Sequence, residues 1–235
     1  MASAHELCGT AFWLSLPFIM PKRKTTLYID GFNLYYGALK RTPYRWLDPV
    51  KMASKIFTKN EIVKTKYFSA RVSNMPHDDQ IEIRQQTYWR ALKSLSNFEI
   101  IEGHYKTKEV RAKNAGKAGF TRVVKTEEKG SDVNLASHLL LDAFSDSFEA
   151  AIVITGDSDL VTPIQMVRDK IGKTVCLLNP SLIEGEYAKT CRRIGELTSV
   201  SSFTKNSIPE RVLRNSQLPN PIQDDIGEIT KPPTW

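Results

Sequence analysis

Cysteine is scarce in this chain: its 235 residues include three, namely Cys8, Cys176 and Cys191. An odd number of cysteines without metal-ligand spacing argues against a disulfide framework and against a zinc knuckle. We therefore expect a protein that works in a reducing compartment, and the cytoplasm is the location that the cysteine usage predicts.

Long apolar runs are also lacking. The stretch AFWLSLPFIM at residues 11–20 is uncharged, but it is ten residues long and contains a proline. It is too short to span a bilayer, and it lacks the basic segment and the small-residue cleavage site of a signal peptide. We expect no membrane segment, and we interpret residues 1–21 as a disordered N-terminal extension.

Size and charge indicate the class of protein and the kind of partner. The chain is long enough for one domain with tails, and its 41% hydrophobic content is enough for a sizeable core. A formal net charge of +7 and a pI near 9.2 favour a polyanionic partner, because a positive field attracts phosphate backbones. Nucleic acid is therefore a better candidate than a small acidic metabolite.

From residue 22 onward, short β-favouring runs alternate with amphipathic helical stretches, which is the pattern of βα units around a parallel sheet. The sequence predicts strands near residues 25–29, 65–70, 98–103, 120–125, 151–155 and 174–178. We expect this domain to cover residues 22–203. The segment 204–235 holds five of the twelve prolines and few bulky apolar residues, so we expect it to be disordered.

Helix starts are marked by capping residues. Asp48-Pro49 predicts a helix through residue 57, and longer periodic stretches predict helices over residues 76–97 and 131–146. Ser181 and Glu184 have capping-box spacing and predict a last helix toward Arg193. Between these elements, residues 106–130 carry eight Lys or Arg against three Glu, which indicates a basic hairpin or a flexible loop.

Four aspartates carry the chemistry. Asp30 ends the apolar run of TLYIDGFN, Asp157 and Asp159 follow the run of AIVITGDSDL, and Asp132 lies in KGSDVNLA at an expected helix start. Carboxyl ends of parallel strands meet at one sheet edge, so these carboxylates should converge. Clustered carboxylates repel unless a hard divalent cation binds, which predicts a Mg²⁺ or Mn²⁺ site. For Asp159, capping of the following helix is an equally good interpretation.

In this order and separation, IDGFNLYY, KGSDVNLA and TGDSDL resemble the three motifs of the NYN-domain family, a branch of the PIN-like nucleases. The resemblance implies a three-layer α/β/α, Rossmann-like fold with a mainly parallel central sheet, and metal-dependent cleavage of RNA. It assigns metal-binding and catalytic roles to the four aspartates, with Asn33 as their polar partner. Where many members have a further Asp, this chain has His138, which we interpret as part of a solvated helix face with Asn134 and Asp142.

RNA binding is expected at basic positions. The basic segment supplies Lys113, Lys117, Arg122 and Lys129, and a second group of cations that alternates with aromatics supplies Arg41 and Arg45. A positively charged groove with aromatic side chains suits single-stranded RNA. Alternatives stay open: Asn33 as a helix cap, Lys129 as an exposed loop charge, and Tyr44 and Trp46 as packing residues.

Two other functions are compatible with the same motif residues. One is a non-catalytic RNA-binding or regulatory module that retains a metal or nucleotide pocket. The other is a phosphohydrolase with an aspartyl-phosphate, although the first motif has no second Asp two residues after Asp30. Oligomeric state is open, a homodimer included.

Overall fold

The computed structural model describes residues 21–74, 78–114, 116, 119–182, 185–187 and 194–235. Its centre is a six-stranded sheet with the order β3-β2-β1-β6-β7-β8, in which every neighbouring pair is parallel. The strands are β1 (Arg23–Asp30), β2 (Asn60–Ser69), β3 (Phe98–Glu102), β6 (Ala150–Ile154), β7 (Thr174–Leu178) and β8 (Phe203–Lys205). The parallel sheet expected from the alternating pattern is confirmed.

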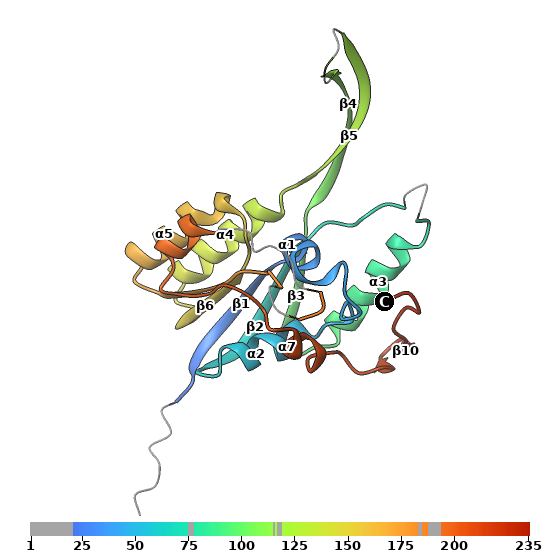
Figure 1. The fold of residues 1–235 in the computed structure, drawn as a ribbon. Coiled ribbons are helices and arrows are strands. Elements are labelled where there is room, and N and C mark those ends of the chain that lie inside the picture. Colours follow the sequence, from blue (N-terminus) through green and yellow to red (C-terminus); the bar gives the residue numbers. More distant parts are fainter. Residues whose placement is uncertain (1–20, 75–77, 115, 117–118, 183–184, 188–193) are drawn as a thin grey trace, which may run out of the picture.

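Helices cover both faces of this sheet (Figure 1). In β1 the side chains alternate, so that Leu27 and Ile29 join one core cluster while Tyr28 joins the other. The first cluster lies under α2 (Pro49–Ile56), α3 (Ile81–Lys93), α7 (Glu210–Arg214) and the π-helical turn η1 (Tyr35–Leu39). The second lies under α4 (Ser131–Phe144), α5 (Val161–Asp169) and α6 (Gly195–Val200). The predicted three-layer α/β/α fold is therefore confirmed.

Strands β1 and β6 are neighbours at the middle of the sheet, and the strand order runs away from them in opposite directions. Such a switch point leaves a crevice at the carboxyl ends of the two strands, where ligands bind in open α/β sheets. Two short helices begin there: α1 (Gly31–Leu34) follows β1, and the 3₁₀ turn η2 (Ser158–Leu160) follows β6. The first and third sequence motifs are thus placed side by side.

The expected strands other than 120–125 all belong to this sheet. Asp48 caps α2 as predicted, because its Oδ1 accepts a hydrogen bond of 2.8 Å from the backbone N–H of Lys51. The helix expected over 76–97 is shorter, since α3 covers Ile81–Lys93. Most of the helix expected after Ser181 falls outside the described residues, and 185–187 are not helical.

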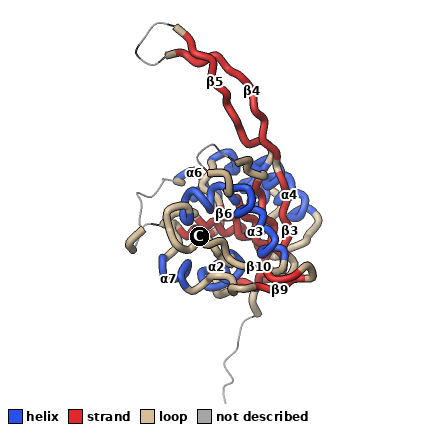
Figure 2. The backbone as a smooth tube through the Cα atoms, turned by 90° about the vertical axis from the view of Figure 1, so that its right-hand side faces the viewer, coloured by secondary structure: helices blue, strands red, loops and turns tan. Residues whose placement is uncertain are grey.

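The basic segment forms an antiparallel hairpin, and of its two expected forms the hairpin is correct. Strand β4 (His104–Lys113) pairs with β5 (Phe120–Lys129), from His104 opposite Lys129 to Lys113 opposite Phe120. We call this hairpin the arm. Ten residues per strand give it a length of roughly 33 Å, and Figures 1 and 2 show it standing away from the body. The strand expected at 120–125 is present as part of β5, but it pairs with β4 in this hairpin and does not belong to the central sheet.

The expectation of a disordered segment at 204–235 is wrong. This segment contains β8, α7 and a small antiparallel pair, β9 (Ile222–Asp224) with β10 (Gly227–Ile229). It folds because several of its apolar side chains, among them Ile208, Leu213 and Leu218, are buried in the first core cluster. An ion pair between Arg90 of α3 and Asp224 also fixes it to the body. The domain therefore continues past residue 203.

No helix among the described residues is long and apolar enough to cross a membrane. The N-terminal extension expected at 1–21 lies almost entirely outside the described residues, so that expectation stays a prediction.

Candidate active site

Asp30 is buried at the end of β1, with 2% of its surface exposed. It is the N-cap of α1: its Oδ1 accepts a hydrogen bond of 2.9 Å from the backbone N–H of Asn33. Its Oδ2 accepts from the Asn33 amide and, at 3.2 Å, from the Thr155 hydroxyl. These three donors fix the carboxylate at the switch point, and burial nevertheless raises its pKa above the ordinary value.

Asn33 links the first and third motifs. Its side-chain amide donates to Asp30, and its Oδ1 accepts a hydrogen bond of 3.3 Å from the backbone N–H of Gly156. A Cβ at Gly156 would lie 3.3 Å from that same oxygen, so glycine allows the close approach. The helix-cap interpretation of Asn33 is wrong, because Asp30 is the cap and Asn33 joins the ends of β1 and β6.

Asp157 and Asp159 lie on the turn after β6. Asp157 is half-buried and caps η2, since its Oδ1 accepts a hydrogen bond of 3.1 Å from the backbone N–H of Asp159. Asp159 itself is exposed, and within this described segment α5 begins at Val161 without a side-chain cap. Capping by Asp159 is therefore wrong, and its carboxylate is left facing solvent near the site.

Asp132 lies in the first turn of α4 and is half-buried. Its pKa is raised to about 6, firstly because of burial and then because of the negative charges of Asp30, Asp157, Glu128 and Asp159. A carboxylate that senses all of these charges must lie close to them. The four predicted aspartates, which come from three separate segments, therefore lie within electrostatic range of one another.

Glu128 is a fifth carboxylate that sequence reasoning did not assign to the site. It belongs to β5, and its two oxygens accept from the backbone N–H and the hydroxyl of Ser131 at 3.1 and 2.8 Å. Gly130 makes the intervening turn with a φ of 96°, a left-handed conformation that favours glycine. The sequence signal for Glu128 is its position four residues before Asp132, whereas composition alone makes it one of the three Glu of the basic segment.

The donor set fits a hydrated divalent cation. Among the described residues, no three His, Cys, Asp or Glu side chains are close enough to enclose an ion by themselves. Mg²⁺ commonly takes one or two carboxylates and keeps several waters, so it does not need such a cage. The ligands are all oxygens, and the mutual repulsion that raises the pKa of Asp132 is what a cation would relieve. The residues thus suit an ion held partly through water.

His138 is not part of a solvated helix face. It is half-buried on α4, and its Nδ1 lies 3.1 Å from the Nζ of Lys66, which is only 4% exposed. The same ammonium group donates to the Oδ2 of Asp142 at 2.6 Å, and the Tyr28 hydroxyl donates to that oxygen at 2.6 Å. His138 and Asp142 therefore belong to a buried network, which corrects the sequence interpretation for both.

The predicted RNA-binding cations of the arm are spread along its length. Lys129 is exposed at the base, directly before Gly130, while Lys113 and Arg122 are exposed toward the tip. Arg122 is 3.9 Å from Glu109 and its side chain is 81% exposed, so this pairing leaves it open to solvent. Lys117 falls outside the described residues.

The second predicted group, in which cations alternate with aromatics, lies partly at the surface and partly in the core. Arg41 is exposed after η1, and Arg45 is half-buried in a pocket wall, with its Nε donating to the carbonyl of Thr42 at 3.1 Å. Trp46 is 1% exposed, and the Tyr44 hydroxyl donates to Glu210 at 3.0 Å. The packing interpretation of Tyr44 and Trp46 is the correct one.

Known proteins are similar to this chain at the level of a family, of a sequence relative and of a solved structure. The model of the NYN domain family matches residues 24–196. A relative from Pseudomonas putida, 6-hydroxy-3-succinoylpyridine 3-monooxygenase HspA, is 30% identical in an alignment 240 residues long. The alignment covers 90% of this chain and 75% of the relative. A crystal structure of a protein of unknown function from Vibrio parahaemolyticus has a TM-score of 0.49 and 18% identity, covering 88% of this chain and 96% of that one.

Proposed function

Because this chain belongs to the NYN-domain family, a PIN-like nuclease family, we propose that it is a divalent-metal-dependent ribonuclease that hydrolyses phosphodiester bonds of single-stranded RNA. The proposal is supported by Asp30 and Asp157 at the switch point of the sheet, with Asp132 and Asp159 within electrostatic range of them. A carboxylate cluster of this kind is expensive to assemble without a cation, because each like charge disfavours ionisation of the next.

Asp30 and Asp157 would hold the Mg²⁺ or Mn²⁺ ion directly, while Asp132 and Asp159 would ligate it or accept hydrogen bonds from its waters. A bound divalent cation supplies an activated water and offsets the charge of the phosphoryl transition state. Asn33 acts as a positioning residue, because it fixes Asp30 against the turn that carries Asp157. No side-chain nucleophile is required.

The arm would provide the grip on RNA. It carries the densest basic segment of the chain, and its base leads through Gly130 directly into the helix of Asp132. A strand of RNA that follows the arm's cations toward Lys129 would therefore reach the acidic site. Attraction of this kind depends on released counterions and weakens as salt rises.

Cleavage of a labelled single-stranded RNA tests the proposal. We expect cleavage with Mn²⁺ or Mg²⁺ and none with EDTA, and we expect Asp157→Asn to lower the rate by about 10²-fold or more. Asparagine caps helices as well as aspartate does, so this variant should fold. Asp169→Asn is the matched control, because Asp169 pairs with Arg168 at the far end of α5.

Other outcomes would contradict the proposal in distinct ways. RNA that is bound but left intact under all conditions would support the non-catalytic RNA-binding module instead. Equal cleavage in EDTA would remove the metal from the proposal.

A second candidate function rests on the Pseudomonas putida relative, whose name describes oxidation of a substituted pyridine. The observation that favours it is an aromatic-lined pocket beside Gly31, which would accept a planar heteroaromatic ring. Turnover of such a compound by this protein, with RNA left intact, would favour this function over the nuclease.

We also propose a cytoplasmic setting, on the strength of the cysteine usage. Cys176 is buried in β7, and burial raises the pKa of its thiol, so it is a packing residue with little thiolate character. Such a thiol is compatible with a reducing compartment and needs no partner.

A further inference from the structure

A pocket of about 280 Å³ lies beside the acidic site. Aromatic side chains from four parts of the chain form its walls: Tyr35 of η1, Tyr67 of β2, Tyr88 and Trp89 of α3, and Trp235. We call it the aromatic pocket. Its volume is near the lower end for small-molecule sites, so it suits one ring system.

The aromatic pocket shares a wall with the acidic site. Gly31 lines it and directly follows Asp30. A Cβ at Gly31 would lie 2.6 Å from the Tyr67 hydroxyl oxygen, so the tyrosine packs directly against the backbone there. Burial raises the pKa of Tyr67 above its ordinary value, and the negative charge of Asp30 adds to this rise. A ligand in the pocket would therefore lie next to Asp30.

The rim of the pocket continues to the arm. Phe32 and Tyr36 are stacked with ring centroids 6.4 Å apart, and the Lys40 ammonium lies 4.7 Å from the centroid of Tyr36. Phe32 also meets Tyr105, at the base of the arm, edge to face at 6.1 Å. Cations that alternate with accessible rings form the surface on which single-stranded nucleic acids stack. Tyr36 is 51% exposed, so part of its ring faces solvent.

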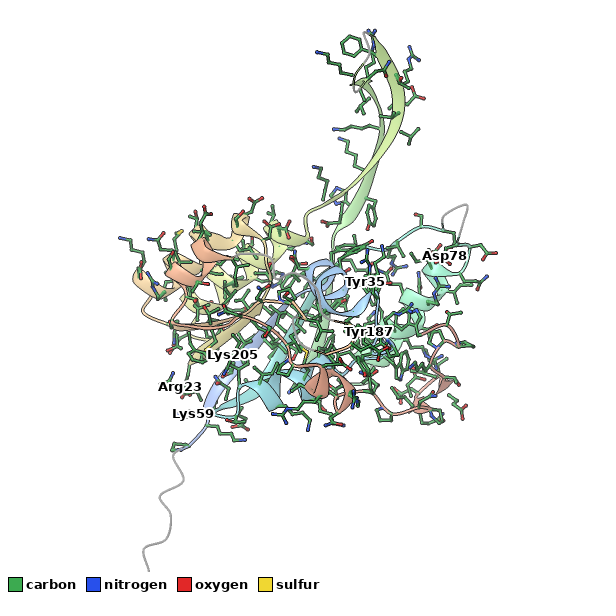
Figure 3. All side chains as sticks on the ribbon, viewed as in Figure 1. Arg23, Tyr35, Lys59, Asp78, Tyr187 and Lys205 are labelled. Carbon is green, nitrogen blue, oxygen red and sulfur yellow. The ribbon has the colours of Figure 1, made fainter. Side chains whose placement is uncertain are left out.

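Polar groups of the pocket are fixed in position. Arg84 pairs with Asp78, and the Gln85 amide donates to the carbonyl of Ala70 at 3.0 Å. Arg45 and Arg84 line the pocket with Tyr35; burial raises the pKa of Tyr35, and the two positive charges partly counteract this rise. In Figure 3, Tyr35 and Asp78 lie on the side of the body from which the arm rises. Aromatic walls with a few fixed polar groups are typical of sites for planar, partly polar ligands.

We propose that the aromatic pocket binds one nucleobase of the RNA substrate, adjacent to the phosphate that is presented to the acidic site. The proposal rests on the proposed ribonuclease function and extends it, because it assigns base recognition to residues outside the carboxylate cluster. A nucleotide and a free heteroaromatic carboxylate have the same general chemistry, a planar heteroaromatic ring that carries an anionic group. The free carboxylate is therefore the competing occupant of the pocket. Stacking of one base contributes about 1–3 kcal/mol.

The test is a binding titration in EDTA, where tryptophan emission reports on the pocket because Trp89 and Trp235 line it. The probes are a short single-stranded RNA, the same RNA with one abasic position placed in turn along it, and pyridine-3-carboxylate. We expect the intact RNA to change the emission and one abasic position to weaken binding by about 5- to 150-fold, which is 1–3 kcal/mol.

The variant Tyr36→Ala should produce a loss of the same size for intact RNA and little further loss for the abasic RNA, while Tyr36→Phe should retain binding. Phe144→Ala is the matched control, since Phe144 is an 83% exposed ring on α4 outside the pocket. Equal affinity of intact and abasic RNA would overturn the inference, as would binding of pyridine-3-carboxylate that RNA does not displace. Cleavage is measured separately, so an inactive protein that still discriminates abasic RNA would refute the nuclease and leave the pocket assignment standing.

Discussion

At the scale of single residues, Asp132 is the group in which the repulsion of the acidic site is most evident. Its raised pKa of about 6 means that the folded protein holds this proton more tightly than the unfolded chain, where an aspartate titrates near pH 3.9. Protonation of Asp132 therefore stabilises the folded state, and this contribution is fully present below about pH 4. This contribution is lost as the pH rises through about 6, where Asp132 ionises among the other carboxylates.

We therefore predict that Asp132→Asn stabilises the metal-free protein at pH 8. Because Asp132 is only half-buried and solvent screens its interactions, the gain should be on the order of 1 kcal/mol, or about 3 °C in Tm. At pH 4 the gain should vanish, since the wild-type carboxyl is then protonated. Thermal unfolding in EDTA at both pH values measures this difference.

Asp225→Asn is the control, because Asp225 is exposed beyond β9. A Tm gain for Asp132→Asn of the same size at pH 4 and pH 8 would show that charge repulsion is not its cause. Added Mg²⁺ should raise the Tm of the wild type more than that of Asp132→Asn, because the ion neutralises a repulsion that the variant lacks.

Residue types at two strand ends and one helix start indicated the four aspartates, but not how they are held. That Asp30 and Asp157 would both cap short helices follows from the turn geometry after β1 and β6, which no residue pattern specifies. Glu128 was missed because its role depends on where the arm ends in space. Asn33 was identified, but its contact with Gly156 joins residues 123 positions apart.

At the scale of elements, a buried charge network joins α4 to the sheet. Lys66 of β2 and Asp142 of α4 have side chains that are only 5% and 17% exposed, and their ion pair is 2.6 Å long. Removal of one partner from a buried pair leaves an uncompensated charge, which costs about 3–5 kcal/mol, whereas removal of both can be nearly neutral.

We predict that Asp142→Leu alone destabilises the protein by about 3 kcal/mol, and that combining it with Lys66→Met recovers most of this loss. Urea unfolding of the two single variants and the double variant measures the coupling. Simple additivity of the two single effects would mean that the pair does not act as a unit. Lys173→Met gives a comparison, because its partner Asp146 is 83% exposed and the effect should stay below about 1 kcal/mol.

Element types were more predictable than element partners. The β-favouring residues around Val123 and Val124 correctly indicate a strand, yet nothing local distinguishes a strand of the central sheet from one of a free hairpin. The segment 204–235 was misjudged from its prolines. Its order depends on long-range contacts, such as the backbone N–H of Leu218 donating to the carbonyl of Trp46 at 2.9 Å, which composition does not encode.

At the scale of the whole molecule, the arm is the feature that most needs a partner. A two-stranded ribbon that projects into solvent is marginally stable by itself, and the register places Arg111 directly opposite Arg122. Like charges across a strand pair are destabilising, and a polyanion along the arm would offset their repulsion. Neither this pairing nor the direction of the arm was evident from the sequence.

We predict that replacing Lys113, Lys117 and Arg122 by Gln flattens the dependence of log affinity for single-stranded RNA on log salt. The slope should fall by about 0.7 for each lost phosphate contact, or about 2 in all. Replacement of Lys51, Lys55 and Lys59, exposed cations in and after α2, removes the same charge from the body and should leave the slope nearly unchanged. Equal slopes for the two triple variants would mean that the arm does not touch RNA.

The arm leaves and rejoins the body at one point. A Cβ at Gly130 would lie 4.0 Å from the Cα of Gly103, so the two glycines that flank the arm are neighbours. The 26 residues between them are thus a nested insertion, which can lengthen, shorten or change charge without shifting the register of any central strand. Evolution can therefore vary what this protein captures independently of the chemistry that it performs.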